Sequence, residues 1–308
     1  MKKTTTICSA LLASIANFLD LESILQIPEE KLRRITSSSQ NLYREIKLKK
    51  KNAGERLITA PDEDLKIIQR AILDSIFNWE PLPASAYGFG KNKTIVDNAR
   101  LHSKNPYVLN ADIKNFFPSV HFTRVDKLYR RLGATDFAAR TLTSLTTVNS
   151  CLPQGSPTSP YIATLSLRNM DYRIAKLCKA NRLTFSRYFD DITISGHKRA
   201  HEVLQTVAAI VAQEGYELHR DLPKLQLFSP GQDRLITGIV IKNGVLCVSS
   251  KDEIMQYILS LQAGGLANLD DENPTKEMLS LLGKIGFVAK VDPVIANQLK
   301  TEFDKIEW

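Results

Sequence analysis

The sequence predicts an α+β fold, because helix and strand patterns both occur along a chain of 308 residues, of which 43% are hydrophobic. Residues 183–195 alternate apolar and polar side chains on both sides of Asp190 and Asp191, which is the period of a half-buried strand. This pattern predicts a strand–turn–strand hairpin with two carboxylates at its tip. Apolar residues recur at helical spacing over residues 62–79, and the tail over 251–308 is expected to be helical with breaks at glycine and proline.

The N-terminal segment, residues 1–44, is expected to form short helices, since Ile7, Leu11 and Ile15 recur at helical spacing. Polar residues interrupt this stretch and no clean cleavage site precedes Asp20, so we do not expect a secretory signal peptide. No other stretch approaches the roughly 20 apolar residues of a membrane span. The four cysteines are scattered and provide neither a zinc motif nor a disulfide framework, which favours a cytoplasmic protein.

The chain is basic, with 41 Lys+Arg against 33 Asp+Glu and a net charge of +8. This excess is compatible with a polyanionic partner but does not identify one. The basic turn over residues 47–56 leads into a short strand over 57–60. It either contacts phosphates or is a solvated charged turn, and its composition leaves both interpretations open. Residues 87–93 contain Gly-x-Gly and two lysines, which alone is weak evidence for phosphate binding.

The remaining elements follow from apolar periodicity and from turn residues. They are a strand over 107–112, helices around 125–132 and over 136–147, a rigid turn at 151–160, a long helix carrying residues 162–177, a helix over 198–213 and a strand over 225–228. Residues 234–241 and 245–248 are expected as two strands joined by Asn243 and Gly244, a strong hairpin signal.

Four motifs in a fixed order resemble those of reverse transcriptases. They are a strand ending in Asp112 with Phe116-Phe117 just after it, the turn over 152–157, the tetrapeptide Tyr188-Phe189-Asp190-Asp191, and a later lysine. The Asp-Asp pair by itself would suit two solvated turn aspartates. Four motifs in the correct order over about 120 residues are far more specific than any one of them.

Two further motifs resemble retron reverse transcriptases in particular. Asn98-Ala99-Arg100-Leu101-His102 is similar to the Asn-Ala-x-x-His element of that family, and Ile236-Thr237-Gly238 is similar to its Val-Thr-Gly element. The resemblance covers residues from about 40 to 250. It implies that Asn98, His102, Thr237 and Gly238 take part in RNA recognition. The alternatives are a satisfied helix histidine at His102 and a strand-filling residue at Thr237.

The resemblance implies that Asp112, Asp190 and Asp191 are catalytic and bind two Mg²⁺ ions, with the backbone carbonyl of Ile113 as an extra ligand. Mg²⁺ prefers a few carboxylates plus substrate oxygens, which suits such a site. In two-metal polymerisation the ions lie about 4 Å apart and assist attack of a primer hydroxyl on an α-phosphate. The alternative for Asp112 is a strand-end cap.

The resemblance also places residues around the nucleotide. Phe117 lies where the family has its sugar-selecting aromatic residue, although Phe116 could take that role, and ordinary core packing is the alternative. Gln154 and Gly155 would line the pocket beside the incoming nucleotide and the template base. The alternative for these two is a helix-entry turn.

Other nucleic-acid contacts are implied in the same way. Arg56 and Lys91 match elements that grip the triphosphate and template, with solvated surface as the alternative, and Lys224 matches a lysine near the triphosphate. Tyr188 and Phe189 would contact primer and template. Phe189 replaces the Ala that is typical of this family, and we expect this bulky residue to be tolerated.

The fold that the resemblance implies is a right-hand polymerase. We expect its parts as follows: an N-terminal helical segment (1–44), fingers (45–105), palm (106–113), a fingers and palm junction (114–157), palm again (158–248) and a helical thumb (249–308). The implied activity is that of a retron's RNA-directed DNA polymerase, which uses deoxynucleoside triphosphates.

Such an enzyme copies part of its own structured non-coding RNA from a guanosine 2′-hydroxyl into branched RNA–DNA (msDNA). The system typically serves antiphage defence with an effector protein. The alternatives are another bacterial reverse transcriptase, of the group II intron, diversity-generating or abortive-infection type, and an RNA-binding scaffold without polymerase activity. The intact set Asp112, Asp190 and Asp191 argues against the scaffold.

Overall fold

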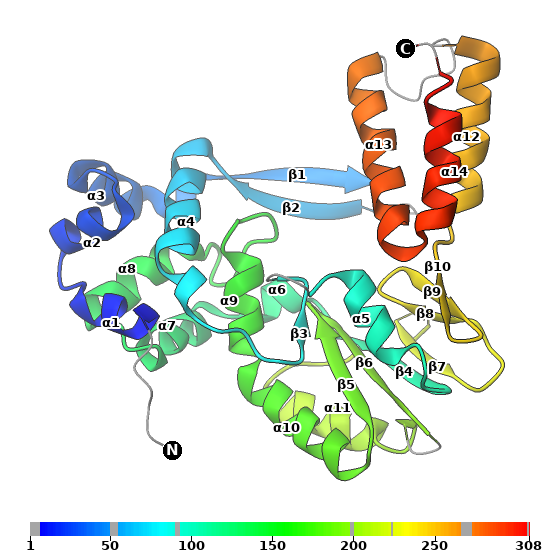
Figure 1. Cartoon of the computed structure of the whole chain (residues 1–308). Coiled ribbons are helices and arrows are strands. Elements are labelled where there is room, and N and C mark those ends of the chain that lie inside the picture. Colours follow the sequence, from blue (N-terminus) through cyan, green and yellow to red (C-terminus); the bar gives the residue numbers. More distant parts are fainter. Residues whose placement is uncertain are drawn as a thin grey trace. The chain divides into compact units, whose positions relative to one another are not determined.

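The computed structural model describes residues 7–49, 55–89, 93–197, 200–222, 224–265, 273–306 and 308 (Figure 1). The chain divides into two compact units, each assembled from several segments. The first unit contains Met1–Ala86, Asp112–Leu177 and Gln205–Arg220, and the second contains Tyr87–Ala111, Cys178–Leu204 and Asp221–Trp308. Helices and strands occur in both, which confirms the predicted mixture of α and β structure.

Helices make up most of the first unit. They are α1 (Ile7–Ser14), α2 (Phe18–Leu25), α3 (Glu29–Ser38), α4 (Glu63–Ser75), α6 (Phe116–Ser119), α7 (Phe122–Arg131), α8 (Asp136–Thr146), α9 (Ser159–Ser166), most of α10 (Arg168–Ala180) and α11 (Leu204–Gln213), with 3₁₀ turns η1 (Ser39–Asn41) and η2 (Phe77–Trp79). Of the helix expected over 198–213, residues 198–199 lie outside the described part of the chain, and α11 begins at Leu204. The expected long helix over 162–177 is interrupted at Leu167, between α9 and α10, next to a hydrogen bond from the Ser166 hydroxyl to the Ile162 carbonyl at 2.8 Å.

The N-terminal helices were predicted and occur as α1, α2 and α3. Asn17 separates the first two, since its side chain accepts from the backbone N–H groups of Leu19 and Asp20, and the Asp20 carboxylate accepts in return from the Asn17 N–H. This capping box begins α2 at Phe18. Of the residues whose spacing predicted a helix, Ile15 is fully buried and Leu11 is partly buried, whereas Ile7 is 56% exposed. Leu12, next to Leu11, is the fully buried residue of α1 that faces the core with Cys8.

The prediction for residues 43–56 was wrong in part. Tyr43–Lys49 forms strand β1 and Glu55–Pro61 forms strand β2, and the two pair antiparallel with Lys47 opposite Leu57. Lys47 therefore lies within a strand and not in a turn. The strand was hidden because its alternating positions carry charges and exposed apolar residues, such as Leu48, which is half exposed. Residues 50–54 lie outside the described part of the chain.

A five-stranded sheet organises the second unit. Its strands are β3 (Ala86–Tyr87), β4 (Tyr107–Asp112), β5 (Thr184–Tyr188), β6 (Asp191–Gly196) and β7 (Leu225–Phe228), in the order β3-β5-β6-β4-β7. The pairs β5–β6 and β4–β7 are antiparallel. The predicted hairpin over 183–195 is confirmed as β5 and β6, with Phe185 opposite Ile194 on its apolar face.

The hairpin is buried on both faces, so the prediction of a half-buried strand was wrong. Ser186 and Ser195 point to the polar face, yet both are fully buried. Helix α5 (Ile95–His102) covers this face, and its His102 hydrogen-bonds both serines. Alternation of polarity therefore reflects a buried polar layer here and not contact with solvent.

A smaller three-stranded sheet follows, with β8 (Arg234–Ile236), β9 (Ile239–Lys242) and β10 (Val245–Cys247) in the order β10-β9-β8. The Asn243-Gly244 hairpin is confirmed, with both residues at positive φ. The single strand expected over 234–241 is wrong, because Thr237 and Gly238 form a two-residue turn between paired Ile236 and Ile239. Both have positive φ, and threonine is a strand former that rarely takes this conformation.

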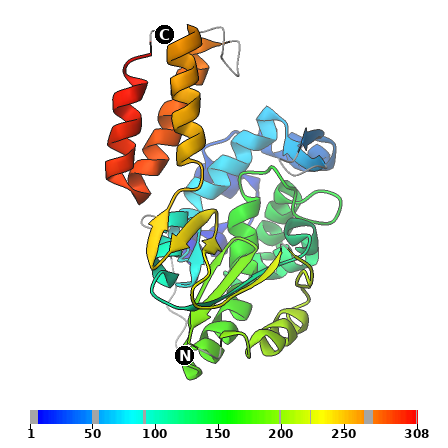
Figure 2. The ribbon, with the colours of Figure 1, turned by 90° about the vertical axis from the view of Figure 1, so that its right-hand side faces the viewer.

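The C-terminal tail is helical, as predicted, and forms α12 (Lys251–Gly264), α13 (Pro274–Val291) and α14 (Pro293–Phe303) (Figure 2). Asn273 and Asp292 cap α13 and α14, and each cap is followed by a proline at the first helical position. The three helices share a core of buried apolar residues. They are Val248, Ile254, Ile258, Leu261, Leu281, Ile285, Val288, Ala296, Leu299, Phe303 and Ile306. Among the helices of the described ranges, none has the length and apolar character needed to cross a membrane.

Candidate active site

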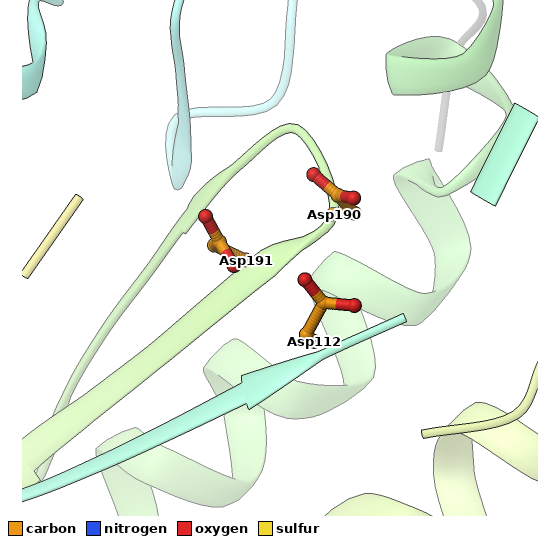
Figure 3. Close-up of side chains that lie close together, drawn as sticks. All are labelled: Asp112, Asp190 and Asp191. Atoms are coloured by element: carbon orange, nitrogen blue, oxygen red, sulfur yellow. The ribbon is translucent and has the colours of Figure 1, made fainter. Parts of the chain in front are cut away.

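Three carboxylates lie together at the end of the five-stranded sheet (Figure 3). Asp112 is the last residue of β4, Asp191 is the first residue of β6, and Asp190 lies in the turn between β5 and β6. One ligand oxygen of each lies within 4.8 Å of the others, with Asp112 buried and the other two half-buried. The two neighbouring strands bring together residues that are far apart in the sequence, and they provide hard oxygen ligands suited to a divalent cation.

The turn that carries Asp190 has an unusual backbone. Tyr188 pairs with Asp191, so Phe189 and Asp190 form a two-residue loop, and Phe189 has a φ of 53°. Arg187, which is fully buried, donates from Nη1 to the Phe189 carbonyl at 2.5 Å. This hydrogen bond fixes the turn, and sequence patterns missed it because Arg187 occupies an apolar-face position of β5.

The ring of Phe189 packs against a neighbouring loop. It makes an edge contact with Phe89 at a centroid distance of 5.0 Å and another with Tyr188 at 4.8 Å. A Cβ on Gly88 would lie 3.0 Å from the Phe189 ring, so glycine is needed there for close approach. The bulky residue at position 189 is thus accommodated by an aromatic cluster and not by the apolar face of the hairpin.

Two backbone hydrogen bonds hold the segment after β4. The His219 N–H donates to the Asp112 carbonyl at 2.9 Å, and the Lys114 N–H donates to the Glu217 carbonyl at 2.8 Å. The His219 ring also lies 3.5 Å from Oδ1 of Asp112, measured at Nε2. Sequence reasoning did not find His219, since no motif connects it with Asp112.

The two phenylalanines after Asp112 have different environments. Phe116 is buried in the core, whereas Phe117 is partly exposed, and their ring centroids lie 5.3 Å apart. Helix α6 begins at Phe116, after Asn115 in the left-handed region. Of the two, Phe117 is therefore the side chain that a ligand can reach.

The turn over residues 152–157 packs against β2. The Thr59 N–H donates to the Gln154 carbonyl at 2.8 Å. Gly155 has a φ of 141°, and a Cβ there would lie 2.8 Å from Cγ2 of Ile58 and 3.0 Å from the Thr59 carbonyl oxygen. Gly155 is exposed and Gln154 partly exposed, so both are accessible at the edge of the turn.

Comparisons with known proteins agree with this arrangement. Residues 48–256 match the family described as "Reverse transcriptase (RNA-dependent DNA polymerase)". The Retron Ec73 reverse transcriptase of Escherichia coli is 31% identical over 280 residues, covering 84% of this chain and 86% of that protein. The Retron Ec86 reverse transcriptase of Escherichia coli is 27% identical over 297 residues, covering 94% and 89%, and the Retron Se72 reverse transcriptase of Salmonella heidelberg (strain 579083-10) is 28% identical over 308 residues, covering 95% and 80%.

The chain belongs to the retron reverse transcriptase family. It is therefore an RNA-directed DNA polymerase, and its family implies the right-hand polymerase fold. The resemblance inferred from the motifs is confirmed. A divalent metal ion fits both the family and the carboxylate cluster of Asp112, Asp190 and Asp191.

The basic residues predicted for this reverse transcriptase are only partly described. Arg56 lies in β2 with its backbone opposite Leu48, and Lys91 lies outside the described residues. Lys224 is exposed and directly precedes β7, whose first residue, Leu225, pairs with Ala111 of β4. Lys224 therefore precedes the β7 residue that pairs with Ala111, and Ala111 is the residue before Asp112.

The four residues predicted to recognise RNA differ in exposure. Asn98 and His102 lie on α5 and are fully buried, Thr237 is partly exposed and Gly238 is exposed. Burial lowers the pKa of His102 to about 3, so the ring is neutral at physiological pH. Buried side chains do not contact RNA directly in this conformation, which favours the alternative of a satisfied helix histidine at His102.

Proposed function

We propose that this reverse transcriptase copies part of its cognate structured non-coding RNA, starting from a guanosine 2′-hydroxyl of that RNA, and so makes branched RNA–DNA (msDNA). The observation that supports the proposal is the cluster of Asp112, Asp190 and Asp191 in a member of the retron family. Its substrates are deoxynucleoside triphosphates. An effector protein of the same system is the proposed partner in antiphage defence in the cytoplasm.

The three carboxylates are the proposed metal ligands. Their oxygens lie close enough to share cations, and they leave coordination positions for substrate oxygens, as Mg²⁺ requires. Two Mg²⁺ ions held there would lower the pKa of the attacking hydroxyl and stabilise the leaving oxygens of pyrophosphate. Asp190 and Asp191 are half-buried, whereas Asp112 is buried at the end of β4.

The backbone carbonyl of Ile113 is a further proposed ligand. Ile113 forms an isolated antiparallel bridge with Leu218, flanked by the hydrogen bonds of Lys114 with Glu217 and of His219 with Asp112. In such a non-hydrogen-bonded pair the N–H and C=O groups of Ile113 point away from the Leu218 strand. Its carbonyl is therefore available to a ligand on the other side.

Nucleotide binding is proposed for residues around this centre. Phe117 would exclude a ribose 2′-hydroxyl, Gln154 and Gly155 would border the incoming nucleotide, and Lys224 would approach the triphosphate. Arg56 and Lys91 are assigned to the fingers by motif alone. The proposed parts of the hand are those given above, with α12, α13 and α14 as the thumb.

The proposed reaction is tested by sequencing the nucleic acid that copurifies with the wild-type protein and with Asp190→Asn. We expect the wild type to yield DNA joined to an internal guanosine of one RNA, with the DNA released by a 2′,5′-debranching enzyme. The variant should yield the same RNA without DNA. DNA that begins at an RNA 3′ end, in a wild-type preparation that extends primers normally, would contradict the branched product.

Phe117→Ala is expected to admit ribonucleotides, because it removes a steric block without adding any attraction. The measurement is the ratio of deoxynucleotide to ribonucleotide incorporation on a primed template with Mg²⁺. The matched control is Phe116→Leu, which keeps apolar bulk at the buried neighbour and should leave the ratio near that of the wild type. An unchanged ratio in Phe117→Ala would show that the sugar gate lies elsewhere.

A further inference from the structure

A continuous chain of hydrogen bonds runs beneath the catalytic hairpin. It joins helix α5 to both strands. His102 Nδ1 lies 2.6 Å from Ser195 Oγ, and His102 Nε2 lies 2.7 Å from Ser186 Oγ. Asn105 Nδ2 donates to Ser195 Oγ at 2.7 Å, and Ser186 Oγ donates to Asn98 Oδ1.

The chain continues to the β8–β9 turn. Asn98 Nδ2 lies 3.5 Å from Thr237 Oγ1, and the Thr237 hydroxyl donates to the Ile95 carbonyl at 3.4 Å. Thr237 has a φ of 46°, a conformation that costs a β-branched residue about 1–3 kcal/mol. Its hydroxyl contacts with α5 offset part of this strain and explain why a threonine is placed at this turn.

The direction of every hydrogen bond in this chain is consistent. The Ser186 hydroxyl donates its hydrogen bond to Asn98 Oδ1. In its contact with His102 the Ser186 oxygen can then only accept, so Nε2 of His102 carries the ring hydrogen and donates it. The Ser195 oxygen accepts a hydrogen bond from Asn105 Nδ2, and the Ser195 hydroxyl donates one to His102 Nδ1. Each donor therefore has one acceptor, with a neutral imidazole at the centre. A buried polar network that is fully satisfied rigidifies the elements it joins.

We propose that Asn98, His102 and Thr237 are positioning residues, which act through Ser186 and Ser195 to hold the β5–β6 hairpin and thereby the carboxylates of Asp190 and Asp191. Asn98 and His102 are one helical turn apart on α5 and face the same layer. Ser186 lies on β5 and Ser195 on β6, so both strands are clamped. The motifs over 98–102 and 236–238 thus stabilise the hairpin that carries the proposed metal ligands Asp190 and Asp191.

This proposal rests on the proposed metal-binding role of Asp190 and Asp191, but not on the branched product. Loss of the network would let the hairpin tip move, which weakens metal binding and DNA synthesis on any template. A role in reading RNA would instead weaken only the reaction on the cognate RNA. The two roles therefore differ in a measurable way.

The test compares Ser186→Ala, Ser195→Ala and Thr237→Val with the wild type on an annealed primer and an arbitrary template. The control variants are Thr237→Ser, which keeps the hydroxyl, and Ser103→Ala, which removes a buried hydroxyl of the same helix region that bonds the Arg100 carbonyl outside the network. We expect the Mg²⁺ concentration for half-maximal rate to rise about fivefold or more in the serine variants. It should rise less in Thr237→Val and stay near wild type in both controls.

A second readout does not depend on activity. In the metal-free protein, backbone amides of residues 184–196 should exchange hydrogen faster in Ser186→Ala and Ser195→Ala than in Ser103→Ala, while affinity for the copurified RNA stays unchanged. Thermal unfolding identifies any variant that does not fold. If the serine variants do not fold, the comparison of Thr237→Val with Thr237→Ser tests the proposal, because Thr237 is partly exposed and its replacement disturbs the core less. Unchanged Mg²⁺ dependence and exchange in folded variants would overturn the proposal, as would a loss confined to the cognate RNA. Full activity of Asp190→Asn would instead overturn the metal-binding role itself.

Discussion

Asp190→Asn and Asp112→Asn are each expected to abolish DNA synthesis, with a loss of at least about 10³-fold in rate. Each change replaces a charged ligand oxygen by a neutral amide at a turn or a strand end. Neither change creates a cavity, because asparagine has nearly the volume of aspartate. Primer extension with Mg²⁺, on an annealed template, measures the effect.

Two control measurements show whether the aspartate variants still fold and still bind RNA. We expect the melting temperature and the affinity for RNA to stay close to those of the wild type, because the basic residues that contact phosphates are unchanged. Glu217→Gln is the matched charge-neutralising change, since Glu217 is exposed and its ion pair with Lys114 is a surface pair. Wild-type extension by either aspartate variant would remove these residues from the catalytic centre.

Local sequence patterns predicted the hairpin that carries Asp190 and Asp191 well. Alternation around Asp190 and Asp191 specified two strands, and Asn243-Gly244 specified a turn that needs two residues at positive φ. Motif order then joined Asp112 to the pair, although they are far apart in the chain. These predictions succeeded because each depends on residues close in sequence or on a spacing shared by a whole family.

The predictions that failed depend on contacts between distant segments. Ser186 and Ser195 look solvent-facing in the sequence, and only the packing of α5 buries them. The burial of His102 was not predictable either, since a histidine that bonds two buried hydroxyls has no local signature. Thr237 favours strand by propensity, but its hydroxyl contacts with α5 stabilise a turn.

The neutral His102 makes stability depend strongly on pH. Its pKa is about 3 in the folded protein because burial disfavours the charged ring, and its unfolded value is about 6.5. Well above pH 6.5 neither state binds this proton, and the neutral ring then makes its full contribution to the free energy of unfolding. As pH falls toward 3, the unfolded state binds a proton that the folded state does not, so stability is lost by about 1.4 kcal/mol per pH unit.

Urea unfolding of the wild type and of His102→Gln at pH 7.0, 6.0 and 5.0 isolates this contribution. Above pH 5 most carboxylates keep their charge, so the comparison reports chiefly on the histidine. His102→Gln should be less stable than the wild type at pH 7.0, because glutamine satisfies the two hydroxyls less well. That difference should shrink by about 2 kcal/mol at pH 5.0, since the variant has no proton to gain on unfolding. Ser103→Ala should keep the pH slope of the wild type. Parallel slopes in the wild type and His102→Gln would mean that the ring gains its proton over the same pH range in the folded and unfolded states. The pKa of His102 would then not be lowered by burial, and the buried network would not hold a neutral ring below about pH 6.5.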